Sequence, residues 1–154
     1  MKAYRITGSK YAGDISGIGA ARYGGRWNKK GRPVLYTGES IEIALLESLV
    51  HVPHMIIPSW DLLTLEVPEH SMTVLTPSDL PENWDHYPAP GILAEIGDRW
   101  LTEDQTLVLS VPSCIIPSAR NYILNGSHPE YDKIKIIGHH PFQTDRRLFK
   151  FSKS

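Results

Sequence analysis

The chain has 154 residues, and its hydrophobic fraction of 41% and charged fraction of 21% suit one compact domain with a buried core. Sixteen basic and seventeen acidic side chains give a formal net charge of -1, without the basic excess of a protein that follows a phosphate backbone. We therefore expect a single domain over residues 1–154 and no direct binding to nucleic acid.

The amino terminus and the cysteine content indicate the compartment. The segment Met1-Lys2-Ala3-Tyr4-Arg5-Ile6 lacks the apolar run of a signal peptide, and no stretch of the sequence is apolar for long enough to span a bilayer. The one cysteine, Cys114, cannot form an internal disulfide, which agrees with a reducing compartment. We expect a soluble cytoplasmic protein that does not enter a membrane.

Short apolar segments bounded by turn formers predict more strands than helices. In chain order, the pattern predicts strands over Lys2–Ile6, Val34–Thr37, Leu62–Val67, Met72–Leu75, Thr106–Val111, Lys133–His139 and Arg147–Phe151. Helices are expected over Ile41–His51, with Ser40 as the N-cap, and over Gly91–Leu101. Because the helices fall among the strands without regular alternation, the predicted fold class is α+β, a mixed or antiparallel sheet with flanking helices.

One glycine-rich segment invites comparison with a dinucleotide-binding loop. Gly17-Ile18-Gly19-Ala20-Ala21-Arg22 matches the fingerprint until its last position, where Arg22 replaces the required glycine. No strand clearly precedes this segment. We therefore reject a Rossmann fold.

Glu47 is the first candidate functional residue, because apolar residues spread around most of the Ile41–His51 helix, as in a buried helix. An ionised carboxylate in such a surround needs a cation or several hydrogen-bond donors to offset its desolvation. A structural account is that Glu47 reaches solvent at one edge of the helix or forms a structural ion pair. A functional account needs further residues.

The segment Gly24-Gly25-Arg26-Trp27-Asn28 supplies residue types suited to a dinucleotide. Paired glycines let the backbone approach a ligand, and an arginine can donate two parallel hydrogen bonds to a phosphate. A neighbouring aromatic ring can stack on a base or on nicotinamide. The structural alternative is a glycine turn followed by a core Trp27 and a surface Arg26.

Four segments in a fixed order resemble the RES domain, a family named for its arginine, glutamate and serine. They are Gly24-Gly25-Arg26-Trp27-Asn28, Val34-Leu35-Tyr36-Thr37-Gly38-Glu39-Ser40, Ala44-Leu45-Leu46-Glu47 and Val111-Pro112-Ser113. The similarity continues through Ile115, Pro117, Asn121 and Asn125-Gly126-Ser127-His128-Pro129, so it covers about Ser16 to Pro129. The family often carries a proline near the position of Gly126, and we expect this departure to have only local loop effects.

The resemblance implies a toxin of a bacterial type II toxin–antitoxin pair, similar in fold to ADP-ribosyltransferases, that takes NAD+ as its substrate and cleaves the nicotinamide–ribose bond. By position, Glu47 would be the catalytic acid, Arg26 would hold the phosphates, and Tyr36 would pack against the nicotinamide or its ribose. The NAD+-binding set would comprise Arg26, Trp27, Tyr36, Ser113 and Asn121. A carboxylate beside the ribose carbon suits this chemistry, since cleavage leaves positive charge there.

The resemblance leaves the acceptor and the assembly open. Water or phosphate as acceptor would make the chain an NAD+-depleting hydrolase or phosphorylase, whereas a protein acceptor would make it an ADP-ribosyltransferase. A non-catalytic interaction module is a third hypothesis, disfavoured by the intact set of Arg26, Tyr36, Glu47 and Ser113. The family also implies an Xre-type antitoxin that blocks the pocket and carries any DNA binding, and a homodimer is possible within the complex.

Other reactive residues are assigned structural roles. His51 and His54, and the pair His139-His140, have no cysteine cluster or HExxH segment beside them, so no metal site is expected. Cys114 lies in an apolar segment and is interpreted as a small core residue. Three tryptophans away from the arginine motif are expected in the core or an interface: Trp60, Trp84 and Trp100.

Overall fold

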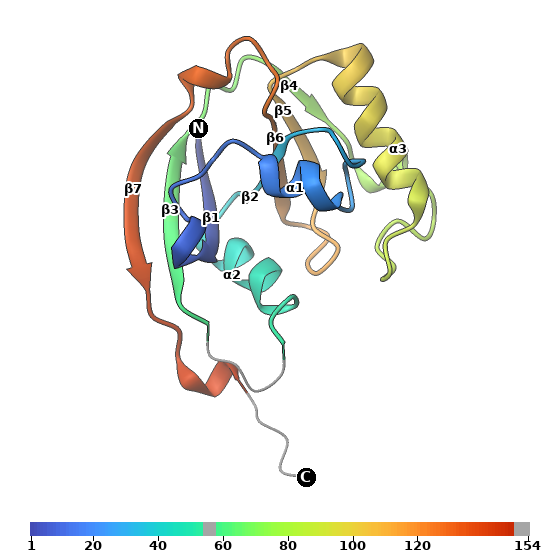
Figure 1. Cartoon of the computed structure of the whole chain (residues 1–154). Helices are drawn as coiled ribbons and strands as arrows, with labels where there is room; N and C mark the ends of the chain where they lie inside the picture. Colours follow the sequence, from blue (N-terminus) through green and yellow to red (C-terminus); the bar gives the residue numbers. More distant parts are fainter. Residues whose placement is uncertain (54–57, 150–154) are drawn as a thin grey trace.

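The computed structural model describes residues 1–53 and 58–149 (Figure 1). Its sheet contains the strands β1 (Lys2–Gly8), β2 (Val34–Gly38), β3 (Trp60–Glu66), β4 (Met72–Val74), β5 (Val108–Pro112), β6 (Arg120–Asn125) and β7 (Lys135–Phe142). They lie in the order β4-β5-β6-β2-β1-β3-β7, and each neighbouring pair is antiparallel except the parallel pair of β4 and β5. This mixed, mainly antiparallel sheet with flanking helices confirms the predicted α+β class.

In the described part of the chain, three α-helices accompany the sheet: α1 (Ile18–Tyr23), α2 (Ile41–Leu49) and α3 (Gly91–Arg99). The side chain of Ser40 accepts a hydrogen bond from the backbone N–H of Ile43 at 3.1 Å, which confirms the predicted N-cap of α2. A π-helical turn over Trp100–Asp104 continues α3, so the predicted helix end at Leu101 falls inside that turn. No helix within the two described ranges is long and apolar enough to cross a membrane.

The strands β1 and β2 separate soon after they meet. Within the described residues, Tyr4 and Gly38 form their one registered pair, whereas β1 pairs with β3 along seven residues. Beyond that pair, Nη1 of Arg5 donates a hydrogen bond to the carbonyl oxygen of Tyr36 at 2.9 Å. A side chain therefore bridges the two strands where backbone pairing has ended, and the sheet is open at this point.

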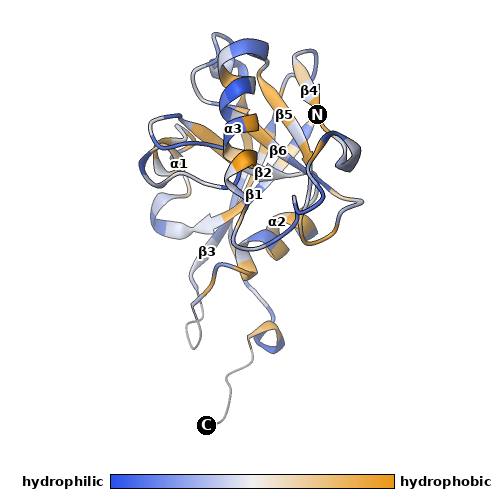
Figure 2. Ribbon diagram, turned by 90° about the vertical axis from the view of Figure 1, so that its right-hand side faces the viewer, coloured by the Kyte–Doolittle hydropathy of each residue, from blue (hydrophilic) through white to orange (hydrophobic). Residues whose placement is uncertain are grey.

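The core packs tryptophans from distant parts of the chain against the central strands. Trp60, Trp84 and Trp100 are all buried, as predicted. Strand β5 is buried at every position and is strongly hydrophobic (Figure 2). Gly97 of α3 lies so close to the backbone of Trp27 that an added Cβ would stand 1.7 Å from the Trp27 carbonyl oxygen. A glycine at this position therefore lets the helix pack directly on a neighbouring backbone.

Two predictions about secondary structure are wrong. The first is the strand over Arg147–Phe151, because Arg146–Leu148 form a 3-10 turn. The Asp145 side chain accepts a hydrogen bond from the Arg147 N–H at 2.9 Å at the start of this turn. Residues 150–151 of the predicted strand lie outside the described part of the chain. Helix α2 is not buried around most of its circumference, because Ile43 and Ala44 are its buried residues whereas Val50, which follows it, is 61% exposed.

Two elements were not predicted. Strand β6 begins and ends with polar residues, which hide its period, yet it lies between β5 and β2 in the middle of the sheet. Helix α1 contains Gly19, a poor helix former, and follows Gly17, whose φ of 78° is left-handed. Both elements therefore depend on tertiary contacts more than on local preference.

Candidate active site

The Glu47 carboxylate, on α2, is held by two uncharged donors. Its Oε1 atom accepts a hydrogen bond from the Ser113 hydroxyl and another from Nδ2 of Asn121, each at 2.8 Å. The ion pairs formed among the described residues do not include Glu47. The carboxylate of Glu47 is thus half-buried, and hydrogen bonds offset the cost of its desolvation. Its negative charge is not paired with a cation among the described residues.

Ser113 and Asn121 reach Glu47 from the two sides of the β5–β6 hairpin, both near its connecting loop. Ser113 follows β5 and is fully buried, and its hydroxyl oxygen accepts from the N–H groups of Ile115 and Ile116 at 3.1 and 3.3 Å. Its single proton is therefore directed to Glu47. Asn121 lies on β6 opposite Gly38 of β2, and its Oδ1 atom is buried without a partner among the described residues. This geometry orients one carboxylate oxygen and leaves an amide oxygen free.

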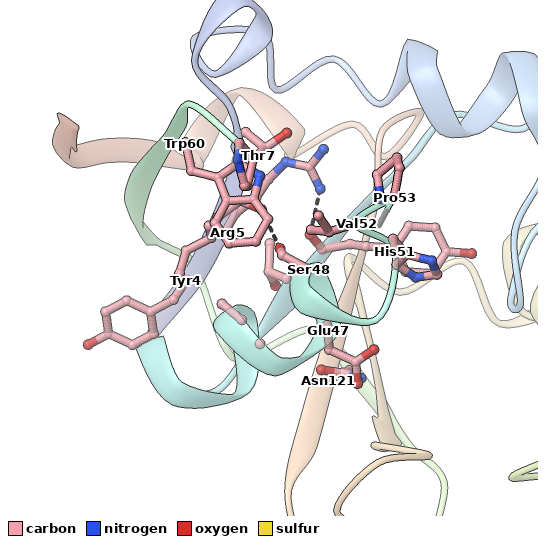
Figure 3. A pocket seen from close by; sticks show the side chains of 16 residues that line it. Tyr4, Arg5, Thr7, Glu47, Ser48, His51, Val52, Pro53, Trp60 and Asn121 are labelled. Carbon is pink, nitrogen blue, oxygen red and sulfur yellow. Dashed lines mark hydrogen bonds between the residues drawn. The ribbon is translucent and has the colours of Figure 1, made fainter. Parts of the chain in front are cut away.

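A cavity of about 390 Å³ opens beside this carboxylate, at the point where β1 and β2 separate (Figure 3). Its volume falls within the roughly 300–1,000 Å³ that is usual for small-molecule sites. Residues of β1, β2, α2 and β6 line it, among them Arg5, Tyr36, Glu47, His51 and Asn121. Three predicted site residues, Tyr36, Glu47 and Asn121, therefore share one cavity, with Ser113 behind Glu47.

Arg5 is a cavity residue that sequence reasoning missed. Burial lowers the pKa of its guanidinium, and its Nε atom has no hydrogen-bond partner among the described residues. One of its terminal nitrogens bonds to the Tyr36 carbonyl, as described above. A half-buried cation in the cavity that holds Glu47 is suited to an anionic ligand. The available signal was a lone arginine inside a short predicted strand.

Tyr36 holds the glycine-rich segment in place through its hydroxyl group. That hydroxyl donates to Oδ1 of Asn28 at 2.7 Å and accepts from the Trp27 N–H at 3.0 Å. Burial raises the pKa of Tyr36, so the hydroxyl stays protonated. A Cβ at Gly25 would lie 2.7 Å from the same hydroxyl oxygen, which explains a glycine there. Tyr36 also lines the cavity.

Arg26 and Trp27 are not among the residues that line this cavity. Arg26 donates from Nη1 to the carbonyl oxygens of Trp84 and His86, at 3.0 and 3.1 Å, and from Nη2 to His86 at 3.1 Å. Trp27 is 2% exposed and packs in the core with Trp84, as in the structural alternative considered for it. In this structure Arg26 fastens the loop around residues 84–86.

The remaining reactive residues have different surroundings. His51 is exposed and lines the cavity one helical turn beyond Glu47, whereas His139 bonds to the Asp61 carboxylate at 2.6 Å. His54 lies outside the described residues. The described ranges contain no group of three or more His, Cys, Asp or Glu placed to hold a metal ion. Cys114 is half-buried, and burial raises the pKa of its thiol, so it is not an activated nucleophile.

Comparison with solved structures supports the fold. A chain from the crystal structure of the M. tuberculosis MbcT–MbcA toxin–antitoxin complex superposes with a TM-score of 0.70, covering 92% of this chain and 83% of that one at 19% identity. At this identity the likeness concerns the fold alone. It agrees with the α+β architecture expected from the sequence.

Three curated proteins resemble this chain at 38% identity. They are Toxin Res of Photorhabdus laumondii (99% of this chain and 100% of the relative), Toxin Res of Yersinia enterocolitica (85% and 88%), and the Prs ADP-ribosylating toxin of Sphingobium sp. (80% and 80%). The family model described as the RES domain matches residues 2–145. On these grounds, and in agreement with the order of its motifs, the chain belongs to the RES domain family.

Proposed function

We propose that this chain is the toxin of a toxin–antitoxin pair and that it binds NAD+ and breaks the nicotinamide–ribose bond. The observation that carries the proposal is the Glu47 carboxylate, oriented by Ser113 and Asn121 in a cavity that also contains Arg5. NAD+ combines a pyrophosphate, which suits Arg5, with a glycosidic bond whose cleavage develops positive charge, which suits Glu47. The toxin names of the curated relatives support the biological role.

In the proposed reaction, the bond between the ribose carbon and the nicotinamide nitrogen breaks, and its electron pair neutralises the pyridinium ring. The ribose carbon becomes cationic, as in glycoside hydrolysis, and Glu47 stabilises it through a nearby negative charge. The acceptor oxygen then bonds to the ribose carbon and releases a proton. Because Ser113 and Asn121 are neutral, they orient Glu47 without cancelling the charge that it offers.

The second candidate function changes only the acceptor. A protein side chain would receive the ADP-ribose in place of water or phosphate, and the resemblance to the Prs ADP-ribosylating toxin favours this alternative. Both functions use the same cavity and the same role for Glu47. They differ in whether free NAD+ is depleted or a protein becomes labelled.

The proposed partner is a separate Xre-type antitoxin that restrains the toxin. Support comes from the M. tuberculosis relative, which was solved in a toxin–antitoxin complex. In such a complex the antitoxin would block the cavity and carry the contacts with DNA. A homodimer of this chain within the complex is part of the same proposal, and light scattering of the purified complex would measure its stoichiometry.

The test is to incubate the purified chain with NAD+, with and without phosphate, and to follow nicotinamide release by chromatography. Glu47→Gln is the matched variant, because its amide oxygen can still accept from Ser113 and Asn121 while the charge is gone. We expect the wild type to release nicotinamide and Glu47→Gln to lose at least about 100-fold in rate. A parallel incubation with labelled NAD+ and cell extract would reveal a modified protein. If the wild type neither releases nicotinamide nor labels a protein, the proposal is overturned.

A further inference from the structure

A second cavity, of about 590 Å³, meets the first at the opening between β1 and β2. Arg5, Thr7 and Tyr36 line both cavities. Because side chains alternate along a strand, Arg5 and Thr7 lie on the face of β1 opposite Ile6, which packs against Ala44 of α2. Residues of α2 line the first cavity and residues of α1 line the second. The two helices lie on opposite sides of β1 and β2 (Figure 2).

The second cavity is lined by large apolar side chains that are exposed to solvent. Tyr11 is 67% exposed, Ile18 is 53% exposed and Tyr23 is 74% exposed, and all three line this cavity. Two of them lie on α1 and the third lies in the 3-10 turn after β1. Two exposed tyrosines at one cavity offer faces for a flat aromatic ligand, because a ring stacks on a planar base over a large area at little cost in conformational entropy.

The cation of Arg5 stands where the two cavities meet. Arg5 is the charged residue that lines both cavities, whereas Glu47 lines only the first, and Asp14 and Arg22 line only the second. A ligand that fills both cavities would thus meet a carboxylate at one end, a cation in the middle and two tyrosine rings at the other. This order matches the order of glycosidic bond, pyrophosphate and adenosine along a dinucleotide.

We infer that the cavity beside α1 is the adenosine subsite and that Tyr11 and Tyr23 hold the adenine ring. The inference rests on the proposed function for the orientation of the dinucleotide, with the nicotinamide ribose beside Glu47. Tyr11 and Tyr23 act on substrate binding, and they lie too far along the dinucleotide to take part in bond cleavage. The subsite accounts for exposed tyrosines that the cleavage step does not use.

The experiment compares two substrates and one ligand. Nicotinamide mononucleotide has the scissile bond but no adenosine, so it reports on the first cavity alone. We expect Tyr11→Ala and Tyr23→Ala to raise the KM for NAD+ about tenfold each while kcat and the cleavage of nicotinamide mononucleotide stay unchanged. The same variants should weaken the binding of AMP, measured by calorimetry, by a similar factor. AMP binding does not depend on catalysis, so it separates failure of the subsite from failure of the proposed reaction.

Matched variants complete the design. Tyr23→Phe and Tyr11→Phe keep the rings and should retain the wild-type KM. Val74→Ala removes an exposed apolar side chain on β4, three strands away from β2, and should change nothing. Melting temperatures close to that of the wild type would show that the alanine variants fold. If the alanine variants keep the wild-type KM for NAD+ and the wild-type affinity for AMP, or if they impair both substrates equally, the adenosine subsite is wrong.

Discussion

Asn121 and Glu47 are 74 residues apart in the sequence, and Nδ2 of Asn121 donates to Oε1 of Glu47 at 2.8 Å. Strand β6 places Asn121 beside β2, and α2 follows directly after β2, so the amide and the carboxylate meet at the edge of one cavity. The second donor, Ser113, approaches the same oxygen atom. One carboxylate oxygen thus accepts two hydrogen bonds, and the other accepts none from the residues that the structure describes.

Removal of the Asn121 amide should slow NAD+ cleavage. A hydrogen bond to a charged group contributes about 1.5–3 kcal/mol, so Asn121→Ala should lower kcat by about 10- to 100-fold. Asn121→Asp should be at least as harmful, because it sets a second negative charge beside Glu47. The measurement is the steady-state rate of nicotinamide release, with melting temperatures as a check on folding. Unchanged rates in both variants would show that Glu47 does not need this donor.

Ser113→Ala should reduce stability as well as activity. The change removes the fully buried hydroxyl that donates to Glu47, and it leaves the N–H groups of Ile115 and Ile116 without their acceptor. We expect a loss of about 1–3 kcal/mol in the free energy of unfolding, measured by urea denaturation. Ser118→Ala, at an exposed position in the same loop, is the control and should change stability by less than about 0.5 kcal/mol.

Tyr36 makes stability sensitive to alkaline pH. Burial raises its pKa in the folded state above the ordinary value of 10.0, so the folded protein holds this proton more tightly than the unfolded chain. The contribution of Tyr36 to the free energy of unfolding is complete below pH 10, and it is lost as the pH rises toward the folded-state pKa. The wild-type melting temperature should therefore fall more steeply above pH 10 than that of Tyr36→Phe. Parallel curves for the two proteins would contradict this assignment.

Arg26 is expected to control the order of the loop around residues 84–86. Arg26→Ala removes three hydrogen bonds to the carbonyl oxygens of Trp84 and His86, so amide hydrogen exchange in this loop should become faster. Arg26→Lys keeps the charge but loses the forked geometry, and an intermediate effect is expected. Exchange followed by mass spectrometry measures this directly. If amide hydrogen exchange in this loop is unchanged in Arg26→Ala, Arg26 does not order the loop and has another role, such as binding phosphates.

Gly97→Ala should be strongly destabilising. Its Cβ would stand 1.7 Å from the Trp27 carbonyl oxygen, so α3 would have to move off the backbone beside it. We expect a loss of about 3 kcal/mol or more in the free energy of unfolding, at or above the upper end of the usual range for overpacking. Gly91→Ala on the same helix is the control, because nothing lies within 4 Å of its Cβ position. Equal stabilities of the two variants would contradict the close approach of α3.

The sequence predicted those features that depend on neighbouring residues. Short segments rich in β-branched or aromatic residues and bounded by turn formers marked most strands, and Ser40 marked the start of α2. The order of motifs identified the family, and it pointed to Glu47, Ser113 and Asn121, which the structure brings into contact. These signals are local, so the sequence shows them without knowledge of the fold.

The separation of β1 from β2 was decided by the tertiary structure. It creates the cavity and brings Arg5 to Tyr36, a contact across 31 positions of sequence. The same holds for Trp27, which the motif placed at the ligand and the fold buries in the core. Strand β6 was hidden because pairing on both sides, with β5 and β2, stabilises it more than its own composition does. Local sequence therefore determined which residues could carry the chemistry, and long-range strand pairing decided which of them face the cavity, because strand pairing depends on partners far along the chain.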